Sequence, residues 1–134
     1  MPDGVQIGSG AQRLIGYQID LSESDGSARI LLDIEDRHRN RNNSLHGGII
    51  SMMLDAAAGF AASRGGPNGS FANVVTVSLT TNYLAAAIGG RVAAIGTYRG
   101  GGRSIAYADA VLEDAQGNRL ATASGVFKRR GPGG

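Results

Sequence analysis

Asp55 is the side chain with the clearest potential for chemistry, because it interrupts an otherwise apolar stretch. Leu54 precedes it and Ala56 follows it. Burying a carboxylate without partners costs several kcal/mol, so such a residue needs an explanation. Asp55 is either a helix residue that reaches solvent or a backbone group, or a general base or nucleophile in a cleft.

The tripeptide His46-Gly47-Gly48 supplies a second chemical group shortly before Asp55. Glycines at the start of a helix let a ligand approach the backbone, and the first helical amides have no partner inside the helix. The helix dipole adds positive potential there, so a carbonyl oxygen bound at Gly47 is stabilised as it becomes an oxyanion. The alternative is a tight turn that requires glycine. His46 either lines a pocket or closes the loop.

The spacing of Gly47 and Asp55 constrains how these two groups can meet. Their separation corresponds to about 12 Å along a helix that rises about 1.5 Å per residue. A carbonyl and the group that attacks it must lie within about 3–3.5 Å of one centre. One straight helix cannot achieve this, whereas two antiparallel copies can. We therefore predict a two-fold homodimer with shared active sites.

The composition excludes several classes of function. A chain of 134 residues fits one domain, and the absence of cysteine removes disulfides, thiolate metal sites and a cysteine nucleophile. The two histidines, His38 and His46, are too few for a multi-histidine zinc site, so we expect no metal. A net charge of +2, with no aromatics among the arginines at 37–41, argues against nucleic acid as a partner. Without an apolar span or signal peptide, we expect no membrane partner and a cytoplasmic protein.

Periodicity and turn residues indicate two strands, one long helix and four further strands. The expected elements are strands 14–21 and 28–34, a helix at 45–63 capped by Asn43 or Ser44, and strands 75–83, 91–99, 105–113 and 120–128. Short connections favour antiparallel neighbours. This order predicts an α+β fold in which an antiparallel sheet of about five to six strands wraps one long central helix. We expect a single domain over 1–134, with a core at about 13–128 and a flexible tail at 129–134.

Small side chains line one face of the last two expected strands, which would let a helix approach closely. They are Ala106, Ala108, Ala110, Ala121, Ala123 and Gly125. In the strand at 75–83, alternation puts Thr76 on the face opposite Val75 and Val77.

The motif resembles the PaaI-like, phenylacetate-pathway type of hotdog-fold acyl-CoA thioesterases. That family has an Asn six residues before His-Gly-Gly and an acidic residue nine after the His. The residues that match this spacing are Asn40, His46, Gly47, Gly48 and Asp55. Further matches are 75–77, 82–84, Arg103, Asp114 and Gly117, so the similarity covers about 14–128. The family often has Gly three residues before the His, where this chain has Asn43.

The resemblance implies a hotdog fold and hydrolysis of an acyl-CoA thioester to the free acid and CoA. The Gly47 amide would polarise the carbonyl, and Asp55 would activate water or attack directly. Asn40 would position the thioester or the water, and His46 would bond to the loop or line the pocket. Thr76 would help to hold the water. If Val75 and Val77 point at the helix, Thr76 needs a bulge or a neighbouring subunit to do so.

Coenzyme A carries several phosphates and belongs to the substrate, so we expect no separate cofactor. Arg103 and Ser104, after the glycine turn at 100–102, are candidates to bind the phosphates, with Arg64 and 128–130 as helpers. Gly48 is expected to border the substrate. The acyl group is either aryl or medium aliphatic, and its candidate lining residues are Met52, Met53, Phe60, Tyr83 and Leu84.

Two other functions stay open on the sequence. Hotdog hydratases and dehydratases pair a His with an acid, and His46 with Asp55 could imitate that pair, although the surrounding motif favours hydrolysis. A non-catalytic acyl-CoA-binding protein would need a missing or neutral acid, whereas Asp55 is present. Hotdog thioesterases are usually dimers or dimers of dimers, so the resemblance also allows a homotetramer.

Overall fold

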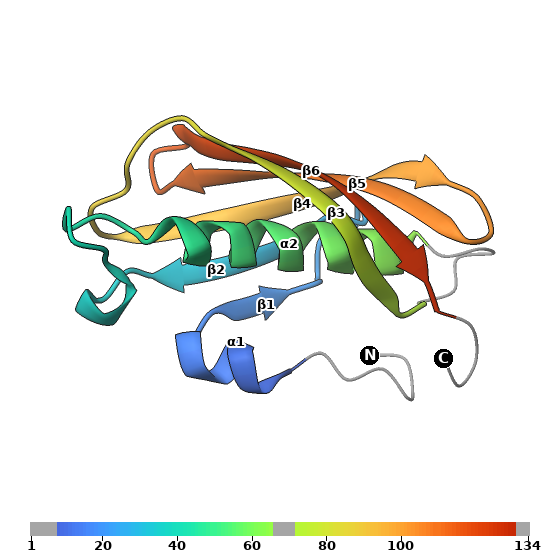
Figure 1. The fold of residues 1–134 in the computed structure, drawn as a ribbon, viewed down its shortest axis with the longest axis horizontal. Coiled ribbons are helices and arrows are strands. Elements are labelled where there is room, and N and C mark those ends of the chain that lie inside the picture. The colour runs from blue at the N-terminus through green and yellow to red at the C-terminus, as the bar shows by residue number, and fades with distance from the viewer. Residues whose placement is uncertain (1–7, 66–71, 131–134) are drawn as a thin grey trace.

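The chain folds as one sheet wrapped around one long helix (Figure 1). The computed structural model describes residues 8–65 and 72–130. The helices are α1 (Gly10–Ile15), the 3₁₀ helix η1 (Asp36–His38) and α2 (Gly47–Arg64). The strands are β1 (Gln18–Asp20), β2 (Ala28–Asp33), β3 (Val74–Tyr83), β4 (Arg91–Gly101), β5 (Ile105–Asp114) and β6 (Arg119–Arg129).

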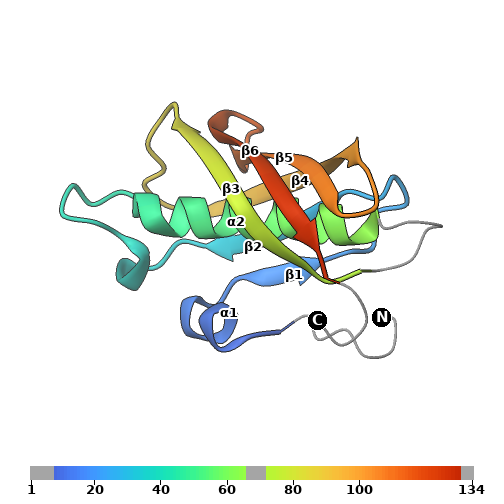
Figure 2. The ribbon, with the colours of Figure 1, turned by 45° about the vertical axis from the view of Figure 1, so that its right-hand side comes forward.

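The sheet is antiparallel throughout, with the strand order β1-β2-β4-β5-β6-β3. It curls along α2, and the edge strand β3 crosses over the helix (Figures 1 and 2). The other edge is the short strand β1. This arrangement confirms the predicted α+β hotdog architecture. It also leaves β3 with one backbone edge that no described strand pairs.

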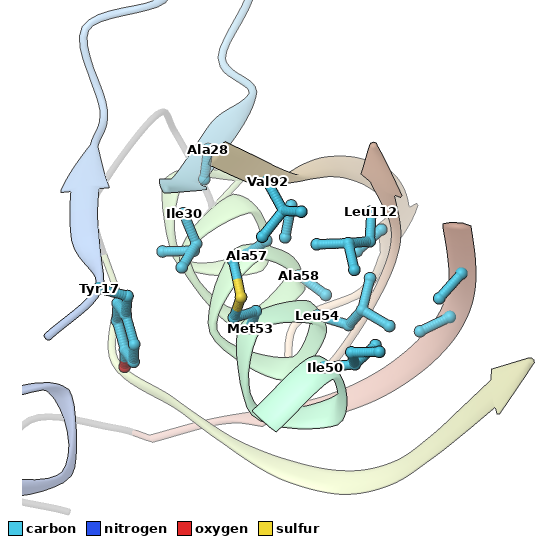
Figure 3. Packing of buried hydrophobic residues seen from close by; sticks show 14 of the residues in the cluster. Tyr17, Ala28, Ile30, Ile50, Met53, Leu54, Ala57, Ala58, Val92 and Leu112 are labelled. Carbon is cyan, nitrogen blue, oxygen red and sulfur yellow. The ribbon is translucent and has the colours of Figure 1, made fainter. Parts of the chain in front are cut away.

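The core lies between α2 and the concave face of the sheet (Figure 3). The six small residues predicted to line β5 and β6 are all buried. On β4, Gly96 faces the helix so closely that an added Cβ would overlap the carbonyl group of Ala57. The sheet can therefore reach the helix backbone because its contacting side chains are small or absent.

One stripe of α2, the uncovered stripe, lies outside the main core and meets its own sheet at the crossing strand β3. Its partly exposed members recur every three or four residues, which places them on one helix face. They are Ser51, Met52, Asp55, Ala56, Gly59 and Phe60. The opposite stripe, which includes Met53, Leu54, Ala57 and Ala58, is buried in the core. No helix within 8–65 or 72–130 is long and apolar enough to span a membrane.

Of the N-terminal strand predicted at 14–21, only Gln18–Asp20 forms a strand, because α1 extends to Ile15 and Gly16 then ends that helix. Ser9 caps this helix by accepting a hydrogen bond from the Gln12 amide. Gly16 ends it in the left-handed conformation, with φ of 89°. The caps reinforce a segment in which Ala11, Gln12, Arg13 and Leu14 all favour a helix, so the extended backbone begins only after Gly16.

Two other predictions need correction at their ends. The side chain that caps α2 is His46, not Asn43 or Ser44, because the loop continues to Leu45 in an isolated bridge with Arg39. Arg129 departs from the predicted flexible tail, since it ends β6 and is 9% exposed. Residues 131–134 of that tail lie outside the described part of the chain.

Replacing Gly96 by alanine should destabilise the fold by about 1–3 kcal/mol, because the new methyl group meets helix backbone that cannot rotate away. Gly102→Ala is the matched control, since a Cβ there has no neighbour within 4 Å. Urea unfolding of both variants measures the difference. Equal stability of Gly96→Ala and the natural chain would contradict the described helix–sheet approach.

Candidate active site

A buried histidine anchors the loop that leads into α2. His38 is 1% exposed, its Nδ1 accepts from the Glu35 amide at 2.9 Å, and its Nε2 lies 2.8 Å from the Ile15 carbonyl oxygen. Because Nδ1 accepts, the proton is assigned to Nε2, which donates to Ile15. The His38 carbonyl then accepts from the His46 amide at 2.8 Å. This chain of contacts sets where the helix begins.

Asn40 shapes the turn before the helix. Its side-chain oxygen accepts from the Asn42 and Ser44 amides at 2.9 and 3.2 Å, and from the Ser44 hydroxyl at 3.3 Å. The turn needs a left-handed residue at Asn43, where φ is 62°. Asn is among the few residues other than glycine that adopt this conformation readily. The departure from the family's glycine is thereby accommodated.

The first turn of α2 has one amide free of acceptors among the described residues, and it belongs to Gly47. The Gly48 amide donates to His46 Nδ1 at 2.8 Å. The amides of Ile49 and Ile50 both donate to the His46 carbonyl at 3.0 Å. The Gly47 N–H therefore stays available to a ligand at the positive end of the helix dipole.

Asp55 lies two turns further along the uncovered stripe of α2, where Thr76 holds it. The Thr76 hydroxyl donates to Asp55 Oδ1 at 2.7 Å. Thr76 pairs with the buried Phe127 of β6 and lines the same pocket as Val74, so it lies on the face of β3 that points at α2. The register of β3 against β6 shifts only after Thr76, between Thr76 and Ser78. Val77 within the bulge is 59% exposed. Val75 is also exposed, at 39%, so the condition that the two valines point at the helix is not met, and Thr76 reaches Asp55 within one chain by ordinary alternation.

An open pocket of about 240 Å³ adjoins this pair. Its walls combine apolar side chains with a few polar groups, a composition typical of sites for small ligands. The lining residues are Asp55, Ala56, Gly59, Phe60, Ser63, Asn73, Val74, Thr76 and Phe127. Of the predicted catalytic residues, Asp55 and Thr76 meet at this pocket, and Phe60 of the predicted acyl-lining residues also lies there.

Tyr17 is a neighbour of Asp55 that the sequence did not reveal. Burial raises the pKa of the Tyr17 hydroxyl above its ordinary value, and the negative charge of Asp55 raises it further. The ring lies beside α2 near Met53 (Figure 3). Tyr17 follows a glycine in a segment predicted as strand, and nothing in that pattern distinguishes it from an ordinary core residue. The raised pKa keeps the Tyr17 hydroxyl protonated at neutral pH.

The predicted phosphate-binding residues fall into two groups, those that donate to backbone carbonyl oxygens and those that are exposed. Arg64 donates to the carbonyls of Ser27 and Glu23 at 2.7 and 3.2 Å, so its guanidinium ties the β1–β2 turn to the helix. Arg103 and Ser104 are exposed in the β4–β5 turn. Arg103 lines a separate open pocket of about 340 Å³, which Arg129 also borders.

Arg129 is the buried cation of that region. Its guanidinium donates to the carbonyl oxygens of Ala62, Gly65 and Gly102, at 3.3, 3.3 and 3.0 Å. It also donates to the Tyr98 hydroxyl at 2.9 Å. A cation at the carboxyl end of a helix is stabilised by the helix dipole, which explains how this charge is tolerated.

Comparisons with known proteins agree with the fold and with the place of the motif. A family model described as the thioesterase superfamily matches residues 42–121. Conserved protein PA5202 from Pseudomonas aeruginosa is 26% identical with a TM-score of 0.83, over 96% of this chain and 100% of that one. The PaaI protein from the phenylacetic acid degradation operon of E. coli is 22% identical with a TM-score of 0.81, and the match covers 92% of this chain and 86% of that one. BH2602 of Bacillus halodurans, solved with CoA, is 24% identical with a TM-score of 0.82, and the match covers 93% of this chain and 81% of that one.

Replacing His46 by alanine should cost about 1 kcal/mol of unfolding free energy, since the Gly48 amide loses its acceptor. His46→Asn is the matched control, because an Asn side chain can accept the same bond and should restore most of the loss. Denaturant unfolding at neutral pH provides the comparison. If the alanine variant is as stable as the natural chain, the His46 cap contributes nothing.

Proposed function

This chain belongs to the thioesterase superfamily, and we propose that it hydrolyses an aryl- or fatty-acyl-CoA to the free acid and CoA. Family membership makes the chain a thioester hydrolase. The observation that carries the proposal is the Asp55 carboxylate, which Thr76 holds at 2.7 Å beside an open pocket. The proposed reaction consumes water, and CoA takes part only as a portion of the substrate.

In the proposed mechanism, the thioester oxygen accepts the hydrogen bond of the Gly47 amide. Negative charge develops on that oxygen when the carbonyl carbon is attacked, and a fixed amide at a helix start stabilises it. Asp55 removes a proton from the attacking water, or attacks directly to form an anhydride that water then cleaves. The C–S bond breaks, and the CoA sulfur takes up a proton.

Asn40 and His46 have donors left for the substrate in this mechanism. The Asn40 oxygen is used by its own turn, which leaves its NH₂ group to position the thioester or the water. His46 Nδ1 accepts from Gly48, so the proton is assigned to Nε2, which can donate into the site. Gly48 presents no side chain to the substrate, and its amide is already bonded.

The two chemical groups are proposed to come from two chains. Gly47 and Asp55 lie about 12 Å apart along α2, at about 1.5 Å per residue, so one chain cannot apply both to one carbonyl. The uncovered stripe of α2 contains Asp55, and the neighbouring β3 has an edge that no strand within 8–65 or 72–130 pairs, with Val75 and Val77 exposed. Unpaired apolar edges are a liability in monomers. A second copy of the chain on this face would cover the stripe of α2 and the edge of β3, and it would complete two sites. Two such dimers could form a tetramer.

The coenzyme is proposed to lie against the exposed cations at the β4–β5 turn. The related fold of BH2602 was solved with CoA, which supports this choice of substrate class. Arg103 and Ser104 are exposed there, and Lys128 pairs with Ile105 at the base of the turn. Arg64 and Arg129 are not proposed as phosphate ligands, because carbonyl oxygens already occupy their guanidinium groups.

Asp55→Asn should lower kcat by at least about 10²–10⁴-fold, because it removes the base or nucleophile and keeps the shape of the side chain. KM should change little, since the Gly47 amide and the coenzyme contacts remain. The measurement is thiol release from a panel of aryl- and fatty-acyl-CoAs.

The matched control is Asp33→Asn, which removes an exposed carboxylate paired with Arg91. It should leave kcat unchanged, and melting temperatures of both variants check folding. A folded Asp55→Asn protein with near-natural kcat would remove Asp55 from the mechanism. Water addition to a 2-enoyl-CoA without thiol release would instead favour the hydratase alternative.

Chains carrying Asp55→Asn should regain activity when refolded together with chains carrying Gly47→Pro. Proline removes the Gly47 N–H, and it is well tolerated at the first helical position. In a hybrid dimer, one site combines the intact Gly47 with the partner's intact Asp55. An equal mixture should therefore recover roughly a quarter of the natural activity if sites are shared. No recovery in a mixture whose hybrids are demonstrated by two affinity tags would place each site within one chain.

A further inference from the structure

Tyr83, the last residue of β3, lies directly on the first turn of α2. Its hydroxyl donates to the Gly47 carbonyl oxygen at 3.0 Å and lies 2.7 Å from the Ser51 hydroxyl. A Cβ built on Gly47 would lie 3.5 Å from the Tyr83 ring, so the ring packs against the glycine itself. Both a hydrogen bond and a ring face therefore act on the residue whose amide is free.

The start of α2 needs such a contact because two glycines follow each other there. Glycine has more backbone freedom than any other residue, and helix ends fray. A hydrogen-bond donor contributes fully to transition-state stabilisation only if it is already oriented before the reaction. The His46 side chain restrains the Gly48 amide, but the Gly47 amide has no such partner among the described residues.

We propose that Tyr83 is a positioning residue, which holds Gly47 so that its N–H points at the thioester oxygen. This inference rests on the proposed function. The phenol acts through the carbonyl of Gly47 and does not touch the reacting atoms. Strand β3 links the two halves of the site, because it brings Thr76 to Asp55 near one end and Tyr83 to Gly47 at the other. The bulge in β3 lies between these two contacts.

A role in positioning has a kinetic consequence that a role in substrate binding lacks. Tyr83 is 55% exposed, so its ring could also line the acyl site. Loss of an acyl contact would raise KM, because that contact exists before and during the reaction. Loss of orientation at the oxyanion donor would lower kcat and leave KM nearly constant.

The test is Tyr83→Phe, which keeps the ring and removes only the hydroxyl. Complete loss of an oxyanion donor lowers kcat by about 10²–10³-fold, so its partial disordering should lower kcat by about tenfold, with KM within about twofold. Tyr107→Phe is the matched control, since Tyr107 is a similarly exposed tyrosine on β5, and its variant should keep natural kinetics. Natural kcat in Tyr83→Phe, or a rise in KM alone, would overturn the proposal.

Amide hydrogen exchange supplies a readout that does not depend on catalysis. The Gly48 amide, which shares a peptide group with the Gly47 carbonyl, should exchange several-fold faster in Tyr83→Phe and unchanged in Tyr107→Phe. If the natural chain releases no thiol from any acyl-CoA, the proposed substrate class fails and exchange alone decides the role of Tyr83. Equal Gly48 exchange in the two variants would then overturn it.

Discussion

The approach of α2 to the sheet is the constraint on which the rest of the structure depends. Gly96 leaves no room for a side chain against Ala57, and buried alanines on β5 and β6 continue this thin contact. A sheet that fits so closely can cover only one side of an 18-residue helix. The opposite stripe is partly exposed and is crossed by β3, and its charged residue is Asp55, which avoids the cost of complete burial while it remains beside apolar walls.

Much of this arrangement could be predicted from residue type and spacing. The small residues on β5 and β6 predicted the thin helix–sheet contact, and the separation of Gly47 from Asp55 predicted that they would not meet in one chain. Contacts that depend on tertiary geometry could not be predicted. Alternation placed Thr76 opposite Val75 and Val77, but which of the two faces points at α2 depends on the packing of β3, and no local pattern predicts that Tyr83 lies on the first turn of α2. The cap at His46 was missed because histidine is not among the usual capping residues.

Several residues that match the family motif act on the backbone. Asp114 accepts from the amides of Gln116 and Asn118, and hydrogen bonds from Asn118 are the main reason that its pKa lies below its ordinary value. Gly117 provides the left-handed residue of that turn, with φ of 84°. Asn40 plays a comparable part before α2, since its oxygen organises the turn that sets the helix start. A motif match therefore identifies a fold as much as a reaction, and chemistry must be argued from the groups left free.

The two ends of α2 differ in which backbone groups are left without a hydrogen-bond partner among the described residues. At the carboxyl end, the Arg129 guanidinium covers the carbonyls of Ala62 and Gly65, so the negative end of the dipole is neutralised inside the protein. At the amino end, His46 satisfies its neighbours and leaves the Gly47 amide free among the described residues. A protein that capped both ends equally would gain stability and lose its anion-binding group. The asymmetry leaves positive potential at the start of α2, which is where the proposed mechanism would place the thioester oxygen that becomes negative during the reaction.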